Sequence, residues 1–402
     1  MILVLLRYLA FLPSVTFNLI KGVEIFPWAS LYIFSTNSIS SLYKYYKFFI
    51  IYIALSSIYS IFFIINNSSV NTFFEIIRSL TAYLNVLIIF VYLLNANKEQ
   101  IELFYKTLRN IFIFFILLGF FQFFGFLNKF NFIIEFFVPR ASMDVSGYGG
   151  ITLLSSEPSR AAPEFFFLST IFLLKLRLCN EDFVAFIFLI FILLVTIFVF
   201  KSVDGFVVAT VAIFILYPLF FITFTLIVFL FFLLAENTFL NNRLLIFLTN
   251  IREYQNFELF FDYVSDRSGF RVSSIVSSFY YGFQNLFGGG VGLWKTTSLE
   301  ALNNGYFKPE SIDYFIQVNN SQFTSLRPSS FIANVFLDYG FYGFLVFIIS
   351  FFLSIYNYIN KETLPYLLIF IFCMFFVSSV GNPVLWIVLA LIFKIHKLSE
   401  TK

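Results

Sequence analysis

Residues 183–200 read FVAFIFLIFILLVTIFVF, a run of 18 positions without a charged side chain. Crossing the roughly 30 Å hydrocarbon core of a bilayer takes about 20 apolar residues in a helix. The apolar residues here are consecutive instead of alternating with polar ones, which favours a helix over a strand of a membrane barrel. The run therefore predicts a membrane-spanning helix, and similar runs recur along the chain.

The composition extends this prediction to the whole protein. Of the 402 residues, 60% are hydrophobic, 12% are charged and 66 are Phe, and the mean hydropathy is +0.90. These values lie outside the range of soluble domains. We predict an all-α polytopic membrane protein with about twelve transmembrane helices. The candidate spans are residues 3–20, 23–37, 47–65, 73–94, 110–127, 161–176, 183–200, 205–216, 217–234, 331–356, 363–380 and 383–395.

Lysines and arginines in the short connections predict the orientation, because they are enriched on the cytoplasmic side of membrane proteins. The short connections on the opposite side hold only Lys21 and Lys201. We therefore predict a multi-pass protein with both termini in the cytoplasm. With that orientation, the cytoplasmic side receives Arg7, Lys44, Lys47, Lys98, Lys106, Arg109, Lys175, Arg177, Lys361, Lys394, Lys397 and Lys402.

The same assignment of spans and loops to the two sides of the membrane divides the chain into three parts. Residues 1–234 form a transmembrane bundle of nine spans with an outer loop at residues 128–160. Residues 235–330 form a large extracytoplasmic loop between the ninth and tenth spans, and residues 331–402 form three C-terminal spans with a cytoplasmic tail.

Several classes of site and partner are disfavoured. A net charge of +3 is too small for this length to indicate a nucleic-acid partner. Two distant cysteines, Cys179 and Cys373, and a single histidine, His396, argue against a disulfide framework, a zinc site or a histidine-based triad. The glycines at residues 288–292 lack the spacing of a phosphate-binding loop, and we interpret them as a flexible turn.

The arginines are distributed differently from the lysines. Eight of the eleven lie outside or in the outer part of a span, whereas nine of the fourteen lysines lie inside. The planar fork of arginine suits bidentate contact with phosphate or carboxylate. The outer face therefore either binds an anion or pairs its arginines with neighbouring acids. The eight arginines are Arg78, Arg140, Arg160, Arg243, Arg252, Arg267, Arg271 and Arg327.

Charged residues inside predicted spans are costly and are usually functional. Arg78 and Asp338 would both face the outer half of the membrane, where they could contribute to a binding site. A local ion pair of Arg78 with Glu75, three residues earlier, is the alternative. Asp204 lies at a helix end beside Lys201, and we interpret it as a cap.

Residues 155–165, SSEPSRAAPEF, place an acid, a proline and an arginine between two apolar runs. Ser155 or Ser156 could cap a helix, with Glu157 and Pro158 in its first turn. A catalytic or binding element fits the same residues equally well. Within that element, Glu164 is the expected partner of Arg160.

The order of motifs resembles the bacterial O-antigen polymerase (Wzy) family. The resemblance rests on "EPS" after the fifth span, a long late outer loop with an arginine before "GGGVG", then "NVFLDYGFYG", and "GNP" between the last two spans. It implies a glycosyltransferase of the GT-C type in the bacterial inner membrane, acting in lipopolysaccharide biosynthesis. Such an enzyme joins undecaprenyl-diphosphate-linked oligosaccharide repeats at the outer face. It needs no metal or nucleotide-sugar donor, and a chain-length regulator is a possible protein partner.

The resemblance also suggests roles for individual residues. Glu157 would orient or deprotonate the acceptor hydroxyl, and Arg271 would be the second catalytic residue. The related O-antigen ligases use a histidine in the large outer loop, which this chain lacks, so a polymerase is favoured over a ligase. A flippase or transporter is the other alternative, although its loops are usually short. The expected substrate-binding residues are Arg160, Arg267, Arg327, Arg78 and Asp338.

Overall fold

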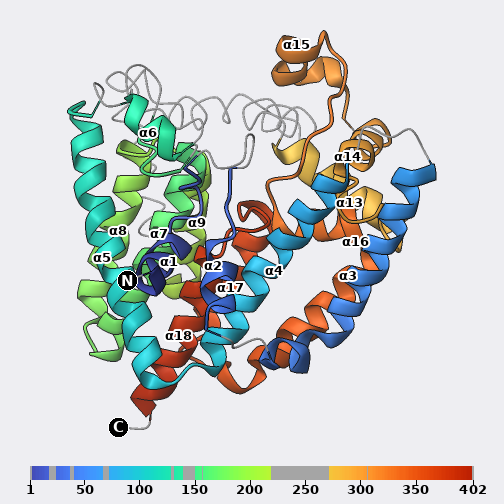
Figure 1. The fold of residues 1–402 in the computed structure, drawn as a ribbon. Helices are drawn as coiled ribbons and strands as arrows, with labels where there is room; N and C mark the ends of the chain where they lie inside the picture. Colours follow the sequence, from blue (N-terminus) through green and yellow to red (C-terminus); the bar gives the residue numbers. More distant parts are fainter. Residues whose placement is uncertain are drawn as a thin grey trace.

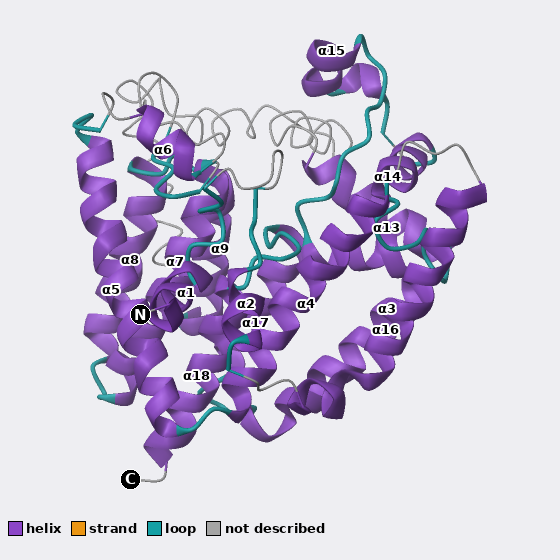
Figure 2. Ribbon diagram, viewed as in Figure 1, coloured by secondary structure: helices purple, strands orange, loops and turns teal. Residues whose placement is uncertain are grey.

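The computed structural model describes residues 2–17, 24–36, 40–66, 72–127, 131–138, 150–155, 157–218, 271–305 and 307–400. Every regular element in these ranges is a helix (Figure 2). The longer elements are α1 (Ile2–Ala10), α2 (Trp28–Phe34), α3 (Ser40–Asn66), α4 (Phe73–Asn95), α5 (Lys98–Phe123), α6 (Asn131–Phe137), α7 (Pro158–Leu178), α8 (Asp182–Phe198), α9 (Val203–Leu216), α13 (Arg271–Gln284), α14 (Trp294–Asn303), α15 (Asp313–Asn319), α16 (Phe331–Ile355), α17 (Leu364–Phe376) and α18 (Val384–Glu400). Two short 3-10 turns, η2 (Pro309–Ser311) and η3 (Tyr356–Tyr358), complete the described elements.

Four of the described helices are long and apolar enough to cross a membrane. They are α3, α4, α5 and α16, the last of these continued by η3. The helices α8, α9 and α17 are apolar but shorter. The prediction of a helical membrane protein is therefore confirmed.

The first two predicted spans are not continuous helices. At 1.5 Å per residue, the nine residues of α1 and the seven of α2 extend only about 14 and 10 Å, far less than a bilayer core. Both helices lie beside the middle of longer ones. The backbone N–H of Ser30 donates to Asn85 Oδ1 of α4 at 2.9 Å, and Asn110 Nδ2 of α5 donates to the hydroxyl of Tyr8 at 2.8 Å.

Other predictions coincide with the structure or lie outside it. The remaining predicted spans up to residue 216 overlap α3, α4, α5, α7, α8 and α9, and the last three overlap α16, α17 and α18. Residues 219–270, which include most of the predicted ninth span and the first part of the large loop, lie outside the described residues.

The centre of the bundle is α18. Its apolar residues are buried on all sides, as expected of a helix enclosed by other helices. Trp386 is fully buried and lies against three rings from different helices, with centroid separations of 5.2 Å to Phe90, 5.4 Å to Phe331 and 5.0 Å to Phe370. These contacts bind α4, α16 and α17 to α18.

One end of the bundle carries lysines. The carbonyl of Leu94, at the end of α4, accepts hydrogen bonds from Tyr358 Oη at 2.7 Å and from Lys394 Nζ at 3.3 Å. Lys175, near the end of α7, lies 3.5 Å above the ring centroid of Tyr105. We call this region, where α4, α7 and α18 end, the lysine end; the C-terminus lies there (Figure 1).

The opposite end carries arginines. Arg78 lies near the start of α4, Arg160 near the start of α7, Arg271 at the start of α13 and Arg327 just before α16. We call this region the arginine end. Because α4, α7 and α16 all run from the arginine end to the lysine end, residues far apart in sequence meet at their starts.

A sharp break divides α16. Gly340 has φ 67° and ψ −168°, which no helix accommodates. The glycine turn at residues 288–292 docks at this break and is largely buried. The interpretation of these glycines as a flexible turn is therefore wrong, because the turn is a packed part of the bundle.

Candidate functional site

A cavity of about 550 Å³ opens at the arginine end. Its walls come from α4, α7, α9 and α13, from the segments preceding α2 and α16, and from the turn between α17 and α18. The residues that line it are Glu24, Ile25, Phe26, Pro27, Phe74, Ile77, Arg78, Thr81, Ala82, Asn85, Glu157, Ser159, Arg160, Asp204, Arg271, Trp294, Ser325, Leu326, Arg327, Pro328, Ser329, Asn334, Val377, Ser379, Val380 and Gly381.

The cavity brings together most of the residues that the sequence predicted for a site. Glu157, Arg160, Arg271, Arg327 and Arg78 all line it. Asp338 does not line the cavity, and Arg267 lies outside the described residues.

Arg271 links three helices at the cavity wall. Its Nη1 donates to Asp204 Oδ2 of α9 at 2.6 Å. Its Nη2 donates to Glu157 Oε2 and, at 2.6 Å, to the hydroxyl of Ser159 at the start of α7. The guanidinium is therefore neutralised by two carboxylates and is fixed in position by both.

Glu157 is the N-cap residue of α7, with an extended backbone, and Pro158 takes the first helical position, where its missing N–H costs no hydrogen bond. The Glu157 side chain makes no capping bond to its own helix. Its Oε2 accepts hydrogen bonds from Arg271 and, at 3.1 Å, from Ser159 Oγ. Oε1 accepts none from the part of the chain that the structure describes, and the side chain is 42% exposed. This oxygen is available to a ligand.

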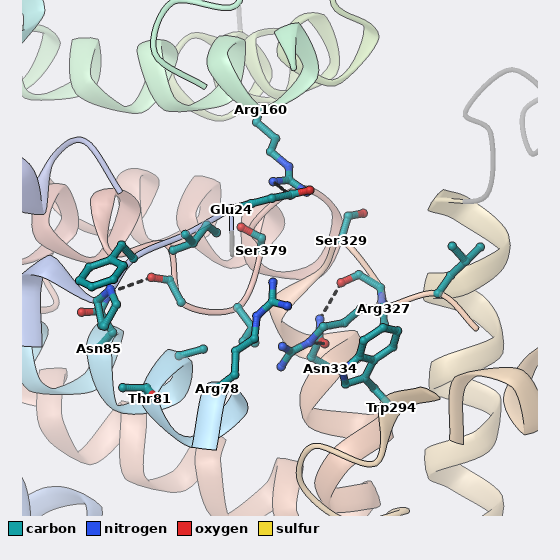
Figure 3. Close-up of a pocket in the computed structure, with 18 of the residues that line it drawn as sticks. Glu24, Arg78, Thr81, Asn85, Arg160, Trp294, Arg327, Ser329, Asn334 and Ser379 are labelled. Atoms are coloured by element: carbon teal, nitrogen blue, oxygen red, sulfur yellow. Dashed lines mark hydrogen bonds and ion pairs between the residues drawn. The ribbon is translucent and has the colours of Figure 1, made fainter. Parts of the chain in front are cut away.

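Arg160 pairs with Glu24, an acid that the sequence did not single out for a site. Its Nη1 lies 2.5 Å from Glu24 Oε2, in the segment before α2 (Figure 3). The pair joins the start of α7 to that N-terminal segment, 136 residues away in sequence. The positive charge of Arg160 is therefore balanced by the Glu24 carboxylate at the cavity wall.

Glu164 has a different partner from the one predicted. It is buried, and it accepts hydrogen bonds from Ser155 Oγ at 3.0 Å and from Asn382 Nδ2 at 2.6 Å. The predicted pair with Arg160 is not formed, and Ser155 bonds to Glu164 instead of capping α7. Glu164 thus ties the "EPS" turn to the "GNP" turn.

Arg78 does not pair with Glu75, as one interpretation of the sequence proposed. Glu75 Oε1 lies 2.5 Å from Lys295 Nζ, and its Oε2 accepts from the backbone N–H of Thr72 at 2.8 Å. Both carboxylate oxygens are engaged. Arg78 itself forms no hydrogen bond or ion pair with any residue that the structure describes.

Among the arginines that line the cavity, Arg327 is the second without a carboxylate partner in the described ranges. Its Nε donates to Asn334 Oδ1 at 2.9 Å, which fixes the side chain, while its buried Nη2 has no hydrogen-bond partner there. Figure 3 shows the guanidinium groups of Arg78 and Arg327 approaching each other inside the cavity, one from α4 and the other from the segment before α16.

The charges of the cavity divide into two groups. Four arginines and three carboxylates line it. Arg160 and Arg271 are paired with the carboxylates Glu24, Glu157 and Asp204. Arg78 and Arg327 face each other without an ion pair to any described carboxylate (Figure 3), and two such cations in one cavity favour a bound anion.

Asp338 is enclosed by the helix bundle and does not reach the cavity. It is buried in α16, where its Oδ2 accepts a hydrogen bond from the Tyr83 hydroxyl at 2.8 Å. Asp338 does not line this cavity, because α16 turns its side chain toward α4.

Two acids of the cavity were not assigned to a site from the sequence. Asp204 was interpreted as a cap, but Ser202 caps α9 by accepting from the Gly205 N–H at 3.2 Å, and Asp204 instead binds Arg271. Glu24 lies in a segment that was predicted to be part of a span. Neither could be assigned without knowing which helices are neighbours.

No protein-family model, curated protein or solved structure matches this chain. Among the described residues, no group of three or more His, Cys, Asp or Glu side chains is placed to hold a metal ion. The chemistry of the cavity is therefore argued from its own residues.

Proposed function

We propose that this protein is a membrane glycosyltransferase that polymerises undecaprenyl-diphosphate-linked oligosaccharide repeats of O-antigen or a similar surface polysaccharide. One observation carries the proposal: the cavity combines a carboxylate that has an open oxygen, Glu157, with two arginines that lack a carboxylate partner in the described ranges, Arg78 and Arg327. Transfer from a lipid diphosphate needs both kinds of group.

The two arginines suit the leaving group. When the bond between the anomeric carbon and the diphosphate oxygen breaks, its electron pair stays on the diphosphate and negative charge develops there. Cations already fixed at that position stabilise the transition state. Arg327 is held by Asn334 at 2.9 Å, so its remaining N–H groups are oriented before substrate binds.

Glu157 suits the acceptor. A sugar hydroxyl of the acceptor attacks the anomeric carbon and forms the new glycosidic bond, and its proton passes to the Glu157 carboxylate. The diphosphate carrier leaves with the electron pair of the broken bond. Both the proton and the electron pair therefore have a receiving group.

The remaining charged residues have positioning roles in this proposal. Arg271 and Asp204 hold the Glu157 carboxylate at the cavity wall, and Glu24 holds Arg160. This changes the roles expected from the sequence, in which Arg160 binds the substrate and Arg271 is catalytic.

The proposed orientation follows the two ends of the bundle. The lysine end would face the cytoplasm under the positive-inside rule, and the cavity would then open toward the outer face of the bacterial inner membrane. We retain a GT-C-type bundle with about twelve crossings. The first two would be made by the interrupted segments around α1 and α2. A chain-length regulator remains a possible partner.

Deletion of the gene followed by gel analysis of surface polysaccharide tests this function. Loss of a polymerase leaves lipid core bearing a single repeat and removes the ladder of longer chains. Loss of a ligase removes even the single repeat from lipid core, and loss of a flippase leaves the repeat unit inside the cell. Either of the last two patterns would overturn the proposal.

A further inference from the structure

Residues 272–294 lie in the predicted extracytoplasmic loop, yet they contain no charged side chain over 23 positions. In the structure they form most of α13 and the glycine turn that follows it. Their polar residues are serines, tyrosines, one Gln and one Asn, so hydropathy alone does not mark them as a span.

The glycine turn lies level with the middle of a membrane-spanning helix. The backbone N–H of Val291 donates to Ser56 Oγ of α3 at 3.0 Å. Ser56 is ten residues from Asn66, the nearer end of α3, which corresponds to about 15 Å along the helix. Since the hydrocarbon core is about 30 Å thick, this contact lies near its centre.

The turn satisfies backbone groups that the break in α16 leaves open. The N–H groups of Gly289 and Gly290 donate to the carbonyls of Leu337 and Asp338 at 2.9 and 3.0 Å. In the other direction, the Tyr342 N–H donates to the Leu286 carbonyl at 3.0 Å. Hydrocarbon offers no water for such groups, so irregular backbone at this depth must be paired within the protein.

Glycine is required for the close approach of the two segments. A Cβ at Gly340 would lie 2.3 Å from the backbone nitrogen of Gly288, and a Cβ at Gly288 would lie 2.5 Å from that of Gly340. Both residues also have positive φ. Most of the buried residues of α13 are small, which is typical of helices packed in membranes; these are Ser273, Ser274, Ser277, Ser278 and Gly282. The rings of Phe279 and Phe283 pack against Phe336 of α16, with centroids 5.1 and 5.2 Å apart.

Large apolar side chains from α13, from the glycine turn and from the adjoining part of α16 are exposed. Phe287 is 72% exposed, Phe283 56%, Tyr342 42% and Leu286 39%. The rings of Phe287 and Tyr342 lie with centroids 5.3 Å apart, so the residues form one surface, which we call the aromatic face. A contiguous patch of this kind is rare on a surface in contact with water.

We propose that α13 and the glycine turn are embedded in the bilayer and that the aromatic face contacts lipid hydrocarbon chains. Together, α13 and the glycine turn then enter and leave the membrane from the arginine end, as a re-entrant segment does. This inference rests on the position of the glycine turn along α3, on its backbone hydrogen bonds to α16 and on the exposure of the aromatic face. It does not depend on the reaction that the cavity performs.

Site-directed spin labelling of the full-length protein in phosphatidylcholine–phosphatidylglycerol liposomes tests the proposal. A background with Cys179→Ser and Cys373→Ser removes the native thiols. The test label is placed by Phe287→Cys. Leu55→Cys on the exposed face of α3 supplies the lipid reference, and Gln317→Cys on α15 supplies the water reference.

The measurement is the accessibility of each label to molecular oxygen, which concentrates in lipid, and to a nickel chelate, which stays in water. We expect the label at 287 to match that at 55, with oxygen accessibility several-fold above nickel accessibility. A label at 287 that matches 317 would overturn the proposal. A label shielded from both reagents would also overturn it, because another protein surface would then cover the face. Leu286→Cys decides the result if the Phe287 variant does not assemble.

Discussion

Arg271, the first residue of α13, donates a hydrogen bond to the carboxylate of Glu157, the residue that precedes α7. The two are 114 positions apart in the chain. Their contact unites the "EPS" turn with the helix that leads to the glycine turn, so the short motifs that carry the family resemblance meet in one region of the structure. In the proposed reaction, this bond orients the carboxylate that receives the acceptor proton.

Glu157→Gln should abolish or strongly reduce polymerisation, because the amide retains the shape and the contact with Arg271 but cannot accept the proton. The loss expected for a general base is about 10²–10⁴-fold. The readout is the polysaccharide ladder in a deletion strain carrying the variant, at matched protein level. Ser159→Ala, which removes one hydrogen bond to the same carboxylate, is the control and should cost much less. A normal ladder with Glu157→Gln would refute the assigned role.

Arg78→Ala and Arg327→Ala should each weaken binding of undecaprenyl diphosphate, because each removes a cation without a carboxylate partner among the described residues. Removing one fixed group that stabilises developing charge also lowers the reaction rate by about 10²–10³-fold, so the polysaccharide ladder should be lost or shortened in the same variants. Arg78→Lys should restore part of the loss, since lysine keeps the charge but not the planar fork. The measurement is binding of the carrier lipid to purified protein in detergent.

Arg109→Ala is the matched control for the arginine variants, because this arginine lies on α5 and does not line the cavity. It should bind the carrier lipid as the unmodified protein does. Equal binding by the Arg78 and Arg327 variants would place the anion elsewhere in the molecule.

Asp204→Asn should reduce polymerisation through Arg271, which then interacts with Glu157 as its sole carboxylate partner in the described region. A double-mutant cycle with Arg271→Gln distinguishes this positioning role from an independent one. We expect the two losses to be clearly less than additive. The matched control is Asp182→Asn, whose carboxylate pairs with Arg177 far from the cavity and is 69% exposed. Fully additive losses would contradict the proposed linkage.

Gly340→Ala should destabilise the fold, because a Cβ there collides with the backbone of Gly288 and the positive φ is unfavourable for alanine. Backbone strain of this kind costs about 1–3 kcal/mol before the collision is counted. Thermal unfolding in detergent should show a lowered midpoint. Leu353→Ala, on the exposed face of the same helix, should change the midpoint little. Equal stability of the two variants would mean that the turn does not dock as described.

Some of the site was predictable and some was not. Glu157 and the arginines stood out because charged residues are rare in so apolar a chain, and their predicted orientation placed them at one end. The predicted pairs Arg78–Glu75 and Arg160–Glu164 rest on helical spacing, which brings residues close in any helix. In the structure Glu75 pairs instead with Lys295, and Glu164 bonds to Asn382, and both of these partners come from distant segments.

The sequence by itself determined that this is a helical membrane protein, because the hydropathy of each run is a local property that acts on each helix separately. It also determined that arginines and lysines separate toward opposite ends. Only the tertiary structure decided which arginines are neutralised, because an ion pair depends on distances between helices that the chain order leaves free. The position of the uncharged segment after Arg271 was decided in the same way, since it is set by the Ser56 side chain of α3 and the backbone groups of α16 to which the segment bonds.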